Sequence, residues 1–414
     1  MVEGTRQRRA RGSAAAKGPK SVALLALLGL WVLFPFLQVG ALAEDAIPFL
    51  AATRVQDATG IYTDDETKVP PPLRDAGCTI APPGTDCAQY ILPFFSPPQV
   101  LPVIAVVDLA GDTGGVLVLR LLGVLSFAGG TWLLWTRTTR RCPEAETPLL
   151  LTAVLLTPFV YTSATFGQSS PLLFLSACLG LRATDRHPGA VGAALVWVGT
   201  VAFKLFPLPL LAVAVLRRRW RFVAWSSGLL VLLTVLAVPL APDGSYGEFL
   251  SSTRALTANR VASPFNVSID AFIHLFDRSW RGDGAAFLAV EVLRVAGIAG
   301  LCWWKLRDAD EDLQWAYAWM VLLALHPQVW WHYFPLIVPA TALALIGRRG
   351  HWWYVLPAVA LAILPMALVT SERTLTYVGP VLIVAATIGV PLLVRPGPVA
   401  TRPATGNALD LAGA

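Results

Sequence analysis

Apolar segments follow one another along the chain from residue 21 to residue 395, separated by shorter polar stretches. The apolar runs are continuous, whereas the strands of a membrane β-barrel alternate apolar and polar positions over roughly ten residues. A helix satisfies its own backbone hydrogen bonds in lipid. The pattern therefore predicts an all-α, multi-span helical membrane protein with about twelve transmembrane helices. The predicted spans cover residues 21–43, 115–136, 148–165, 168–182, 189–205, 206–217, 221–240, 285–305, 314–332, 333–347, 352–370 and 376–394.

The polar stretches define the remaining organisation. Residues 1–20 form a basic tail and residues 396–414 a second tail, and we expect both to be disordered and cytoplasmic. Residues 44–110 are polar, acidic and rich in Pro, which we interpret as a large first external loop with re-entrant or surface helices. Residues 241–284 form the second external loop, so the membrane domain extends over residues 21–395.

Charge is sparse and its placement sets the topology. Hydrophobic residues make up 55% of the sequence and charged residues 14%, with a mean hydropathy of +0.61. A soluble protein needs more charge to cover its surface, which excludes a soluble enzyme, a secreted disulfide scaffold and a disordered chain. The net charge of +6 arises from arginine clusters between apolar segments, which is typical of cytoplasmic loops rather than of a nucleic-acid surface. The clusters lie within residues 6–11, 137–141, 217–221 and 348–349.

Three pairs of consecutive spans are shorter than the ~20 residues that cross a bilayer, and each pair has a polar junction. The junctions contain Gln168, Lys204 and His332, and the predicted topology places all three on the outer side with Asp45. Lys204 lies among apolar residues with no acid nearby in sequence and is followed by helix-breaking prolines. Its ammonium either reaches the interface or lines a membrane cavity, where it would suit a lipid phosphate.

Two adjacent carboxylates, Glu44 and Asp45, end the first predicted span. Such a carboxylate either marks the end of the helix or acts as a general base at the outer membrane surface. Neighbouring helical residues point about 100° apart, so only one of the two would face a cavity. We select Asp45 and keep Glu44 as the competing residue.

Further polar residues lie at similar predicted depths. His326 and His332 are six residues apart in an aromatic segment, off a common helical face and without a nearby carboxylate, so we expect no metal site. Each histidine is either a buried packing residue or part of a binding site, with Tyr333 beside it. Gln168, Asn266 and Arg260 add hydrogen-bonding and cationic groups.

The chain has five cysteines, and no zinc-binding spacing is present among them. Cys78 and Cys87 share the first external loop, where an oxidising exterior makes a disulfide between them plausible.

Taken together, these stretches resemble glycosyltransferase family 87 of the GT-C superfamily over about residues 22 to 395. That family includes polyprenyl-phosphate-mannose-dependent mannosyltransferases of actinobacteria and related arabinofuranosyltransferases. The matching motifs, in chain order, are Asp45-Ala46 after the first span, Gly60-Ile61-Tyr62, Ser96-Pro97-Pro98, Gly167-Gln168-Ser169-Ser170, Lys204-Leu205-Phe206-Pro207, Phe265-Asn266-Val267-Ser268 and His326-Pro327-Gln328-Val329-Trp330-Trp331-His332-Tyr333. The sequence departs from the family pattern at Ser170, Val267, His326 and Tyr333.

The resemblance implies a GT-C type inverting enzyme of the bacterial plasma membrane, with its site facing the periplasm or cell exterior. The expected donor is a polyprenyl-phosphate sugar, most simply mannose, and the acceptor a glycolipid or cell-envelope glycan. Asp45 inherits the role of catalytic base. The matching Lys204 and His332 are implied in binding or positioning the donor phosphate. We add Arg260, Gln168 and Asn266 as further candidates for binding the donor phosphate or sugar, and no cofactor is required.

Three alternatives stay open. The donor could carry arabinose instead of mannose. A transporter or lipid flippase would show internal repeats and polar residues at mid-membrane depth, whereas this chain gathers its polar residues at one face. The departures at Ser170 and Tyr333 would also fit a catalytically inactive scaffold.

Overall fold

The computed structural model describes residues 18–39, 41–55, 61–63, 69–84, 86, 94, 96–180, 189–260, 266–280, 285–348, 350–368 and 372–394. These residues form α-helices and short 3-10 helices, and the isolated β-bridge found among them joins Asn266 to Trp330. The prediction of an all-α membrane protein is confirmed.

Five helical stretches within the described ranges are long and apolar enough to cross a membrane. They are α2 (Pro19–Leu37), α7 (Gly111–Thr139), α8 (Glu146–Phe166) with the preceding η4 (Pro143–Ala145), α12 (Trp220–Ala237) and α15 (Ala285–Lys305). Shorter helices complete the bundle: α9 (Pro171–Leu179), α10 (Gly189–Phe203), η6 (Leu208–Leu210), α11 (Leu211–Leu216), α16 (Glu311–Leu325), η7 (Trp331–Leu336), α17 (Ile337–Ala344), α18 (Trp352–Leu368) and α19 (Glu372–Leu393).

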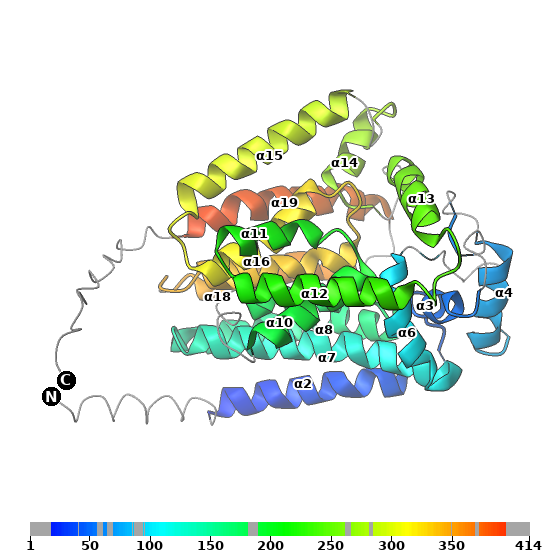
Figure 1. Cartoon of the computed structure of the whole chain (residues 1–414). Helices are drawn as coiled ribbons and strands as arrows, with labels where there is room; N and C mark the ends of the chain where they lie inside the picture. The colour runs from blue at the N-terminus through cyan, green and yellow to red at the C-terminus, as the bar shows by residue number, and fades with distance from the viewer. Residues whose placement is uncertain are drawn as a thin grey trace, which may run out of the picture.

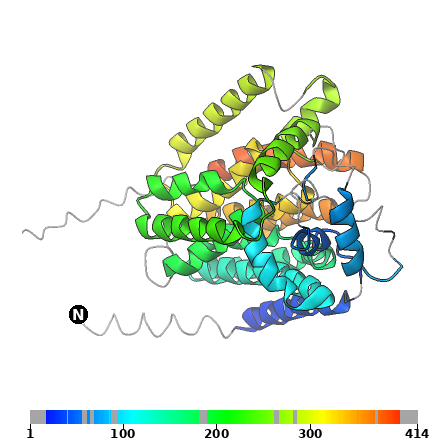
Figure 2. The ribbon, with the colours of Figure 1, turned by 45° about the vertical axis from the view of Figure 1, so that its right-hand side comes forward.

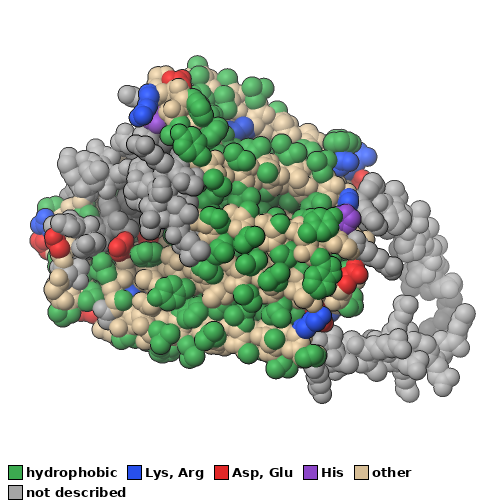
Figure 3. Space-filling model, turned by 180° about the vertical axis from the view of Figure 1, so that it is seen from behind, with side chains coloured by type: hydrophobic (Ala, Val, Ile, Leu, Met, Phe, Trp, Pro, Cys, Tyr) green, Lys and Arg blue, Asp and Glu red, His purple; other side chains and the backbone are tan. Residues whose placement is uncertain are grey.

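The long helices lie side by side with their axes roughly along one direction (Figure 1). Their outward faces are apolar: Leu33 of α2, Val231 of α12 and Leu293 of α15 are all more than half exposed. In the space-filling view, hydrophobic side chains cover the middle of the surface and charged side chains gather toward its two ends (Figure 3). Lipid would cover such a surface, since a soluble protein rarely exposes apolar patches of this extent.

One end of the bundle carries the short helices of the predicted first loop. They are α3 (Ile47–Ala52), α4 (Pro71–Ile80), η3 (Pro98–Val100) and α6 (Leu101–Asp108). Figure 2 views α3 end on, between α4 and α6. These helices share a second apolar core, separate from that of the bundle, which includes Leu50, Leu73 and Leu101. The helices of the second loop, α13 (Ser245–Arg260) and α14 (Ile269–Phe276), lie toward the same end (Figure 1).

At the opposite end, ion pairs join arginines at the end of α7 and just before α12 to acidic residues at the start of α16. Arg141 pairs with Asp310 at 3.0 Å, and Arg137 with Asp312 at 3.6 Å. These arginines belong to the clusters that the sequence assigns to the cytoplasmic side. The helix α7 connects the two ends of the molecule, since it begins beside α6 and finishes at Arg137 and Thr139.

Several predicted boundaries change. The first predicted span reaches residue 43, but α2 ends at Leu37. Residues 41–43 are buried or half-buried inside the protein. Their apolar side chains therefore reflect packing in the protein interior and not a continuation of the helix. Asp45 consequently lies in a connection between α2 and α3 rather than directly at a helix end. The predicted tails lie outside the described residues, except that α2 already begins at Pro19.

Candidate active site

The connection that carries Asp45 packs against the end of α8. The backbone N–H of Asp45 donates to the carbonyl of Phe166 at 3.1 Å. Gly167 ends α8 in the left-handed conformation with φ 73°, and a Cβ atom placed there would lie 2.6 Å from the Cβ of Ala46. Only glycine permits both the backbone angle and the close approach. The glycine therefore sets Asp45 next to Gln168.

Gln168 joins Asp45 to His332. Its buried side chain hydrogen-bonds the Asp45 carboxylate, and its Nε2 lies 3.0 Å from Nδ1 of His332. The hydroxyl of Ser163 donates to Gln168 Oε1 at 3.4 Å, so the amide nitrogen is the end that faces both partners. Because an amide nitrogen only donates, His332 accepts at Nδ1 and keeps its proton on Nε2. The resulting arrangement is a carboxylate and a neutral imidazole held by one amide.

Lys204 brings the positive charge to this group. It directly follows α10, and its backbone N–H donates to Thr200 at 2.9 Å. The preceding carbonyl, that of Phe203, accepts from the Ser96 hydroxyl at 2.8 Å, which ties the end of α10 to the segment before η3. The Lys204 ammonium is within electrostatic reach of Asp45 and of the imidazoles of His326 and His332.

Burial raises the pKa of Asp45 above its ordinary value, although the Lys204 charge and the Gln168 hydrogen bond act in the opposite direction. The pKa of Glu44 is also raised, first by burial and then by the Asp45 charge. A carboxylate whose pKa is raised is a stronger base, which suits it to remove a proton from a hydroxyl group.

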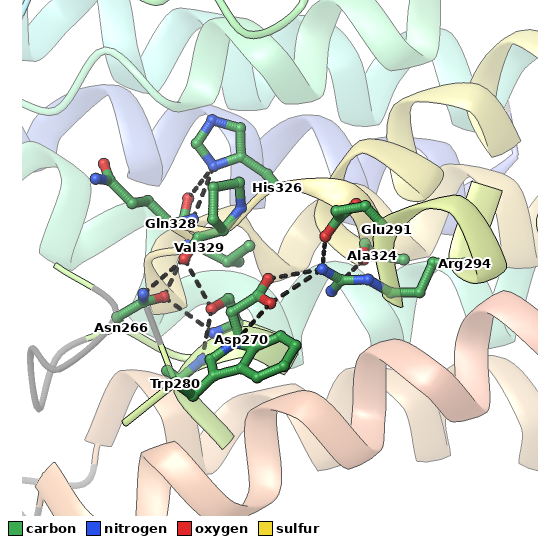
Figure 4. Close-up of polar contacts among 12 residues, drawn as sticks. Asn266, Asp270, Trp280, Glu291, Arg294, Ala324, His326, Gln328 and Val329 are labelled. Atoms are coloured by element: carbon green, nitrogen blue, oxygen red, sulfur yellow. Dashed lines mark hydrogen bonds and ion pairs between the residues drawn. The ribbon is translucent and has the colours of Figure 1, made fainter. Parts of the chain in front are cut away.

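The two sequence stretches around Asn266 and His326 meet in a hydrogen-bonded junction (Figure 4). Asn266 donates from Nδ2 to the carbonyl of Pro327 at 2.7 Å, and its Oδ1 accepts from the N–H groups of Val329 and Ser268, each at 3.0 Å. The amide of Asn266 is thus engaged in holding the segment that leads to His332. This arrangement assigns Asn266 a structural contact that the sequence alone does not reveal.

A buried ion pair anchors the same junction from the other side. Asp270 is fully buried, and both of its carboxylate oxygens accept hydrogen bonds from Arg294 of α15, at 3.0 and 2.9 Å (Figure 4). Arg294 also donates to the carbonyl of Ala324, two residues before His326, at 3.3 Å. The indole of Trp280 donates to Asp270 at 3.2 Å. These contacts connect α14, α15 and α16 just ahead of the histidine segment.

Aromatic rings line the segment itself. The ring of Phe206 lies 5.0 Å from that of His326 and 5.6 Å from that of Tyr333, measured between centroids. Tyr333 is buried and packs edge-on against His332 at 4.6 Å. Trp330 is nearly parallel to the His332 ring, at 6.5 Å. The structure therefore brings His326, His332 and Tyr333 to the segment that contains Lys204 and Phe206.

Two predicted features lie partly outside the described residues. Arg260 is the last residue of α13, and its side chain is not among those described. Cys78 lies in α4, whereas Cys87 is not among the described residues, so the disulfide stays a prediction. No group of three or more His, Cys, Asp or Glu side chains that could hold a metal ion occurs within the described ranges.

Arg120 is a further residue of this neighbourhood, and it lies in none of the sequence motifs. It lies in α7 with 1% of its surface exposed, and it donates to backbone carbonyls of the connection before Asp45 and of the end of α8. The available signal is a single charge in the apolar run Val116–Leu122, since ionisable residues inside membrane helices are rare and usually functional.

The comparisons with known proteins identify a family for the chain. The model of glycosyltransferase family 87 matches residues 94–327, more than half of the 414-residue chain. The matched region contains Gln168, Lys204, Asn266 and His326, while Asp45 and His332 lie on either side of it. No curated protein and no solved structure matches the chain. On the strength of the family match, this chain belongs to glycosyltransferase family 87.

Proposed function

We propose that this membrane glycosyltransferase transfers a sugar, mannose, from a polyprenyl-phosphate donor to a glycolipid or cell-envelope glycan. The reaction takes place at the extracytoplasmic face of a bacterial plasma membrane, with inversion at the anomeric carbon and Asp45 as general base. The observation that carries the proposal is the contact of Asp45 with Gln168 and, through that amide, with His332, in the field of Lys204.

The proposed step is a single displacement. The acceptor hydroxyl oxygen forms a bond to the anomeric carbon while its proton passes to the Asp45 carboxylate. The bond between the anomeric carbon and the phosphate oxygen breaks, and the electron pair leaves with the phosphate. One displacement at carbon inverts its configuration, and the raised pKa of Asp45 favours the proton transfer.

The charge on the departing phosphate needs stabilisation at the same place. Lys204 supplies a cation, and His332 supplies a donor if its Nε2–H faces the phosphate, since its Nδ1 is taken by Gln168. Arg260 is a further candidate from the second loop. A polyprenyl phosphate is already a good leaving group, so the proposal requires no strong general acid.

The test uses the purified full chain in proteoliposomes with labelled polyprenyl-phosphate mannose and a glycolipid acceptor. We expect Asp45→Asn to lower the transfer rate by about 10²- to 10⁴-fold. Glu44→Gln is the matched control, because it neutralises the adjacent carboxylate, and it should keep most of the activity. Full activity of Asp45→Asn at an unchanged protein amount would exclude Asp45 as the base.

Donor exchange separates the alternatives. Transfer from polyprenyl-phosphate arabinose, but not from the mannose donor, would replace the proposed sugar with arabinose. Counterflow of the lipid donor without a covalent product would instead favour a transporter.

A further inference from the structure

Arg120 occupies an unusual position for a charged residue. It lies within the membrane-spanning helix α7, is 1% exposed, and forms no ion pair with any acidic residue in the described part of the chain. A buried charge without a counter-ion is unfavourable unless its hydrogen-bond donors are satisfied. The side chain is held through its two terminal nitrogens by backbone carbonyls, while its buried Nε has no hydrogen-bond partner within the described residues.

The carbonyls come from two segments that meet at the site. From the connection after α2, Arg120 contacts Gln38 through Nη1, and Ala41 and Leu42 through Nη2 at 2.9 and 3.3 Å. From the end of α8, the carbonyl of Thr165 accepts from Nη2 at 2.8 Å. One guanidinium thus joins the connection that carries Asp45 to the helix end that leads into Gln168.

Two further hydrogen bonds join the same two segments. The Gln38 amide donates to the hydroxyl of Tyr161 on α8 at 2.7 Å, and the N–H of Asp45 donates to Phe166. Gln38 is only partly buried and the Asp45 contact is one backbone bond, whereas Arg120 contacts four carbonyls from within the protein.

We propose that Arg120 is a positioning residue for sugar transfer, whose guanidinium holds the Asp45 connection and the Gln168 helix end in the arrangement that the reaction needs. This inference rests on the proposed role of Asp45. A planar guanidinium directs five N–H donors in fixed directions, whereas a lysine ammonium is a point charge with three donors. Arg120→Lys therefore keeps the positive charge but loses the fixed directions of the guanidinium N–H donors.

The pH dependence distinguishes positioning from general stability. The groups that face Asp45 are Glu44 on its own connection, Gln168 after α8, Lys204 after α10 and, through Gln168, His332 of η7. A loosened connection admits water to Asp45 and weakens the burial that raises its pKa. The acid limb of the rate profile should then move to lower pH, because Asp45 loses its proton more readily.

The matched control is Arg137, which lies on the same helix at its opposite end. It also donates to a backbone carbonyl, that of Leu179, and pairs with Asp312. Arg137→Lys should lower stability to a similar degree without changing the acid limb or the environment of Asp45.

The experiment compares Arg120→Lys, Arg120→Met and Arg137→Lys in nanodiscs by hydrogen-exchange mass spectrometry and by transfer assays. For both Arg120 variants we expect faster exchange in the peptide over residues 38–46, a kcat lower by about 10- to 100-fold with KM for the donor nearly unchanged, and an acid limb at lower pH. Arg137→Lys should show none of the three changes.

Unchanged exchange over residues 38–46 together with unchanged kcat would overturn the proposal. So would loss of folding in both Arg120 variants with normal folding of Arg137→Lys, because Arg120 would then support the whole fold and not one connection. If the exchange pattern appears as expected but the wild type transfers no sugar from any polyprenyl-phosphate donor, the proposed function fails while the positioning contact stands.

Discussion

Nε2 of Gln168 lies 3.0 Å from Nδ1 of His332, and the same side chain hydrogen-bonds the carboxylate of Asp45. The three residues come from the connection after α2, the turn after α8, and η7, so an amide links segments that are far apart in sequence. This link determines which ring nitrogen of His332 carries the proton, and it also orients the carboxylate of Asp45. A change at Gln168 should therefore alter both rate and pH dependence.

Gln168→Leu removes the amide while nearly keeping its size. We expect kcat to fall by about 10- to 100-fold, because Asp45 and His332 lose their common partner. The acid limb of kcat should move to higher pH, since the hydrogen bond that lowers the pKa of Asp45 is gone. Gln314→Leu is the control: this amide is also buried but caps carbonyls at the other end of the bundle. An unchanged rate profile for Gln168→Leu would contradict the proposed role of the amide.

Asp45→Asn separates activity from stability. Burial raises the folded-state pKa of Asp45, so the folded protein binds its proton more tightly than the unfolded chain does. The contribution of this carboxyl to stability is therefore most favourable below its unfolded pKa and declines as pH rises through the raised folded pKa. At neutral pH the neutral Asn should melt at the same temperature as wild type or a few degrees higher, while transfer is lost. A scanning melt at pH 7 checks this, and a clearly lower midpoint would argue against the raised pKa.

Hydropathy predicted the class of fold and most helices, because in a membrane protein apolar length and helix formation are closely coupled. The short predicted spans at 168–182, 206–217 and 333–347 correspond to α9, to η6 with α11, and to η7 with α17. The pattern failed after Leu37, where Ala41, Leu42 and Ala43 are apolar because they pack inside the protein and not because they continue α2.

The site could be assembled from the sequence only in part. Unusual residues in apolar surroundings identified Asp45, Gln168, Lys204 and His332, and the structure brings these four together. The sequence could not reveal the backbone contacts of Asn266 and Arg120, because every residue type carries a backbone carbonyl that can accept a hydrogen bond. The carbonyls that these two side chains contact belong to segments distant in sequence, so the fold determines both contacts.

Lys204→Gln tests whether sugar transfer requires the positive charge of Lys204. We expect a loss of about 10²- to 10³-fold in kcat/KM, because the charge on the departing phosphate loses its stabilising partner. The acid limb should move to higher pH, since Lys204 lowers the pKa of Asp45. Lys204→Arg should recover part of the rate. Lys305→Gln, which removes a lysine stacked on Trp304 at the end of α15, should behave as wild type. Equal rates for Lys204→Gln and Lys305→Gln would remove Lys204 from the site.

Gly167→Ala tests the turn that sets Asp45 beside Gln168. The added methyl would meet Ala46 Cβ at 2.6 Å on a backbone with φ 73°, so the connection must shift. We expect a loss of about 1–3 kcal/mol in stability and a larger fractional loss in kcat. Gly228→Ala is the control, since that position in α12 has open space and helical geometry, and the change should be neutral or stabilising. Comparable activity in the two variants would mean that the turn tolerates displacement.

The proposed orientation in the membrane is tested by labelling the two ends of the bundle. Ser251 is exposed on α13, toward the end that carries the candidate site, and Asp308 is exposed between α15 and α16 at the end that carries the arginine ion pairs. A membrane-impermeant maleimide added to intact cells should modify Ser251→Cys and spare Asp308→Cys, because the reagent cannot cross the bilayer to reach the end that the arginine clusters assign to the cytoplasm. Peptide mass spectrometry assigns the modified position independently of the native cysteines, and permeabilised cells should label both. The reverse pattern in intact cells would place the site on the cytoplasmic face, where the donor would have to be reached from the inner leaflet.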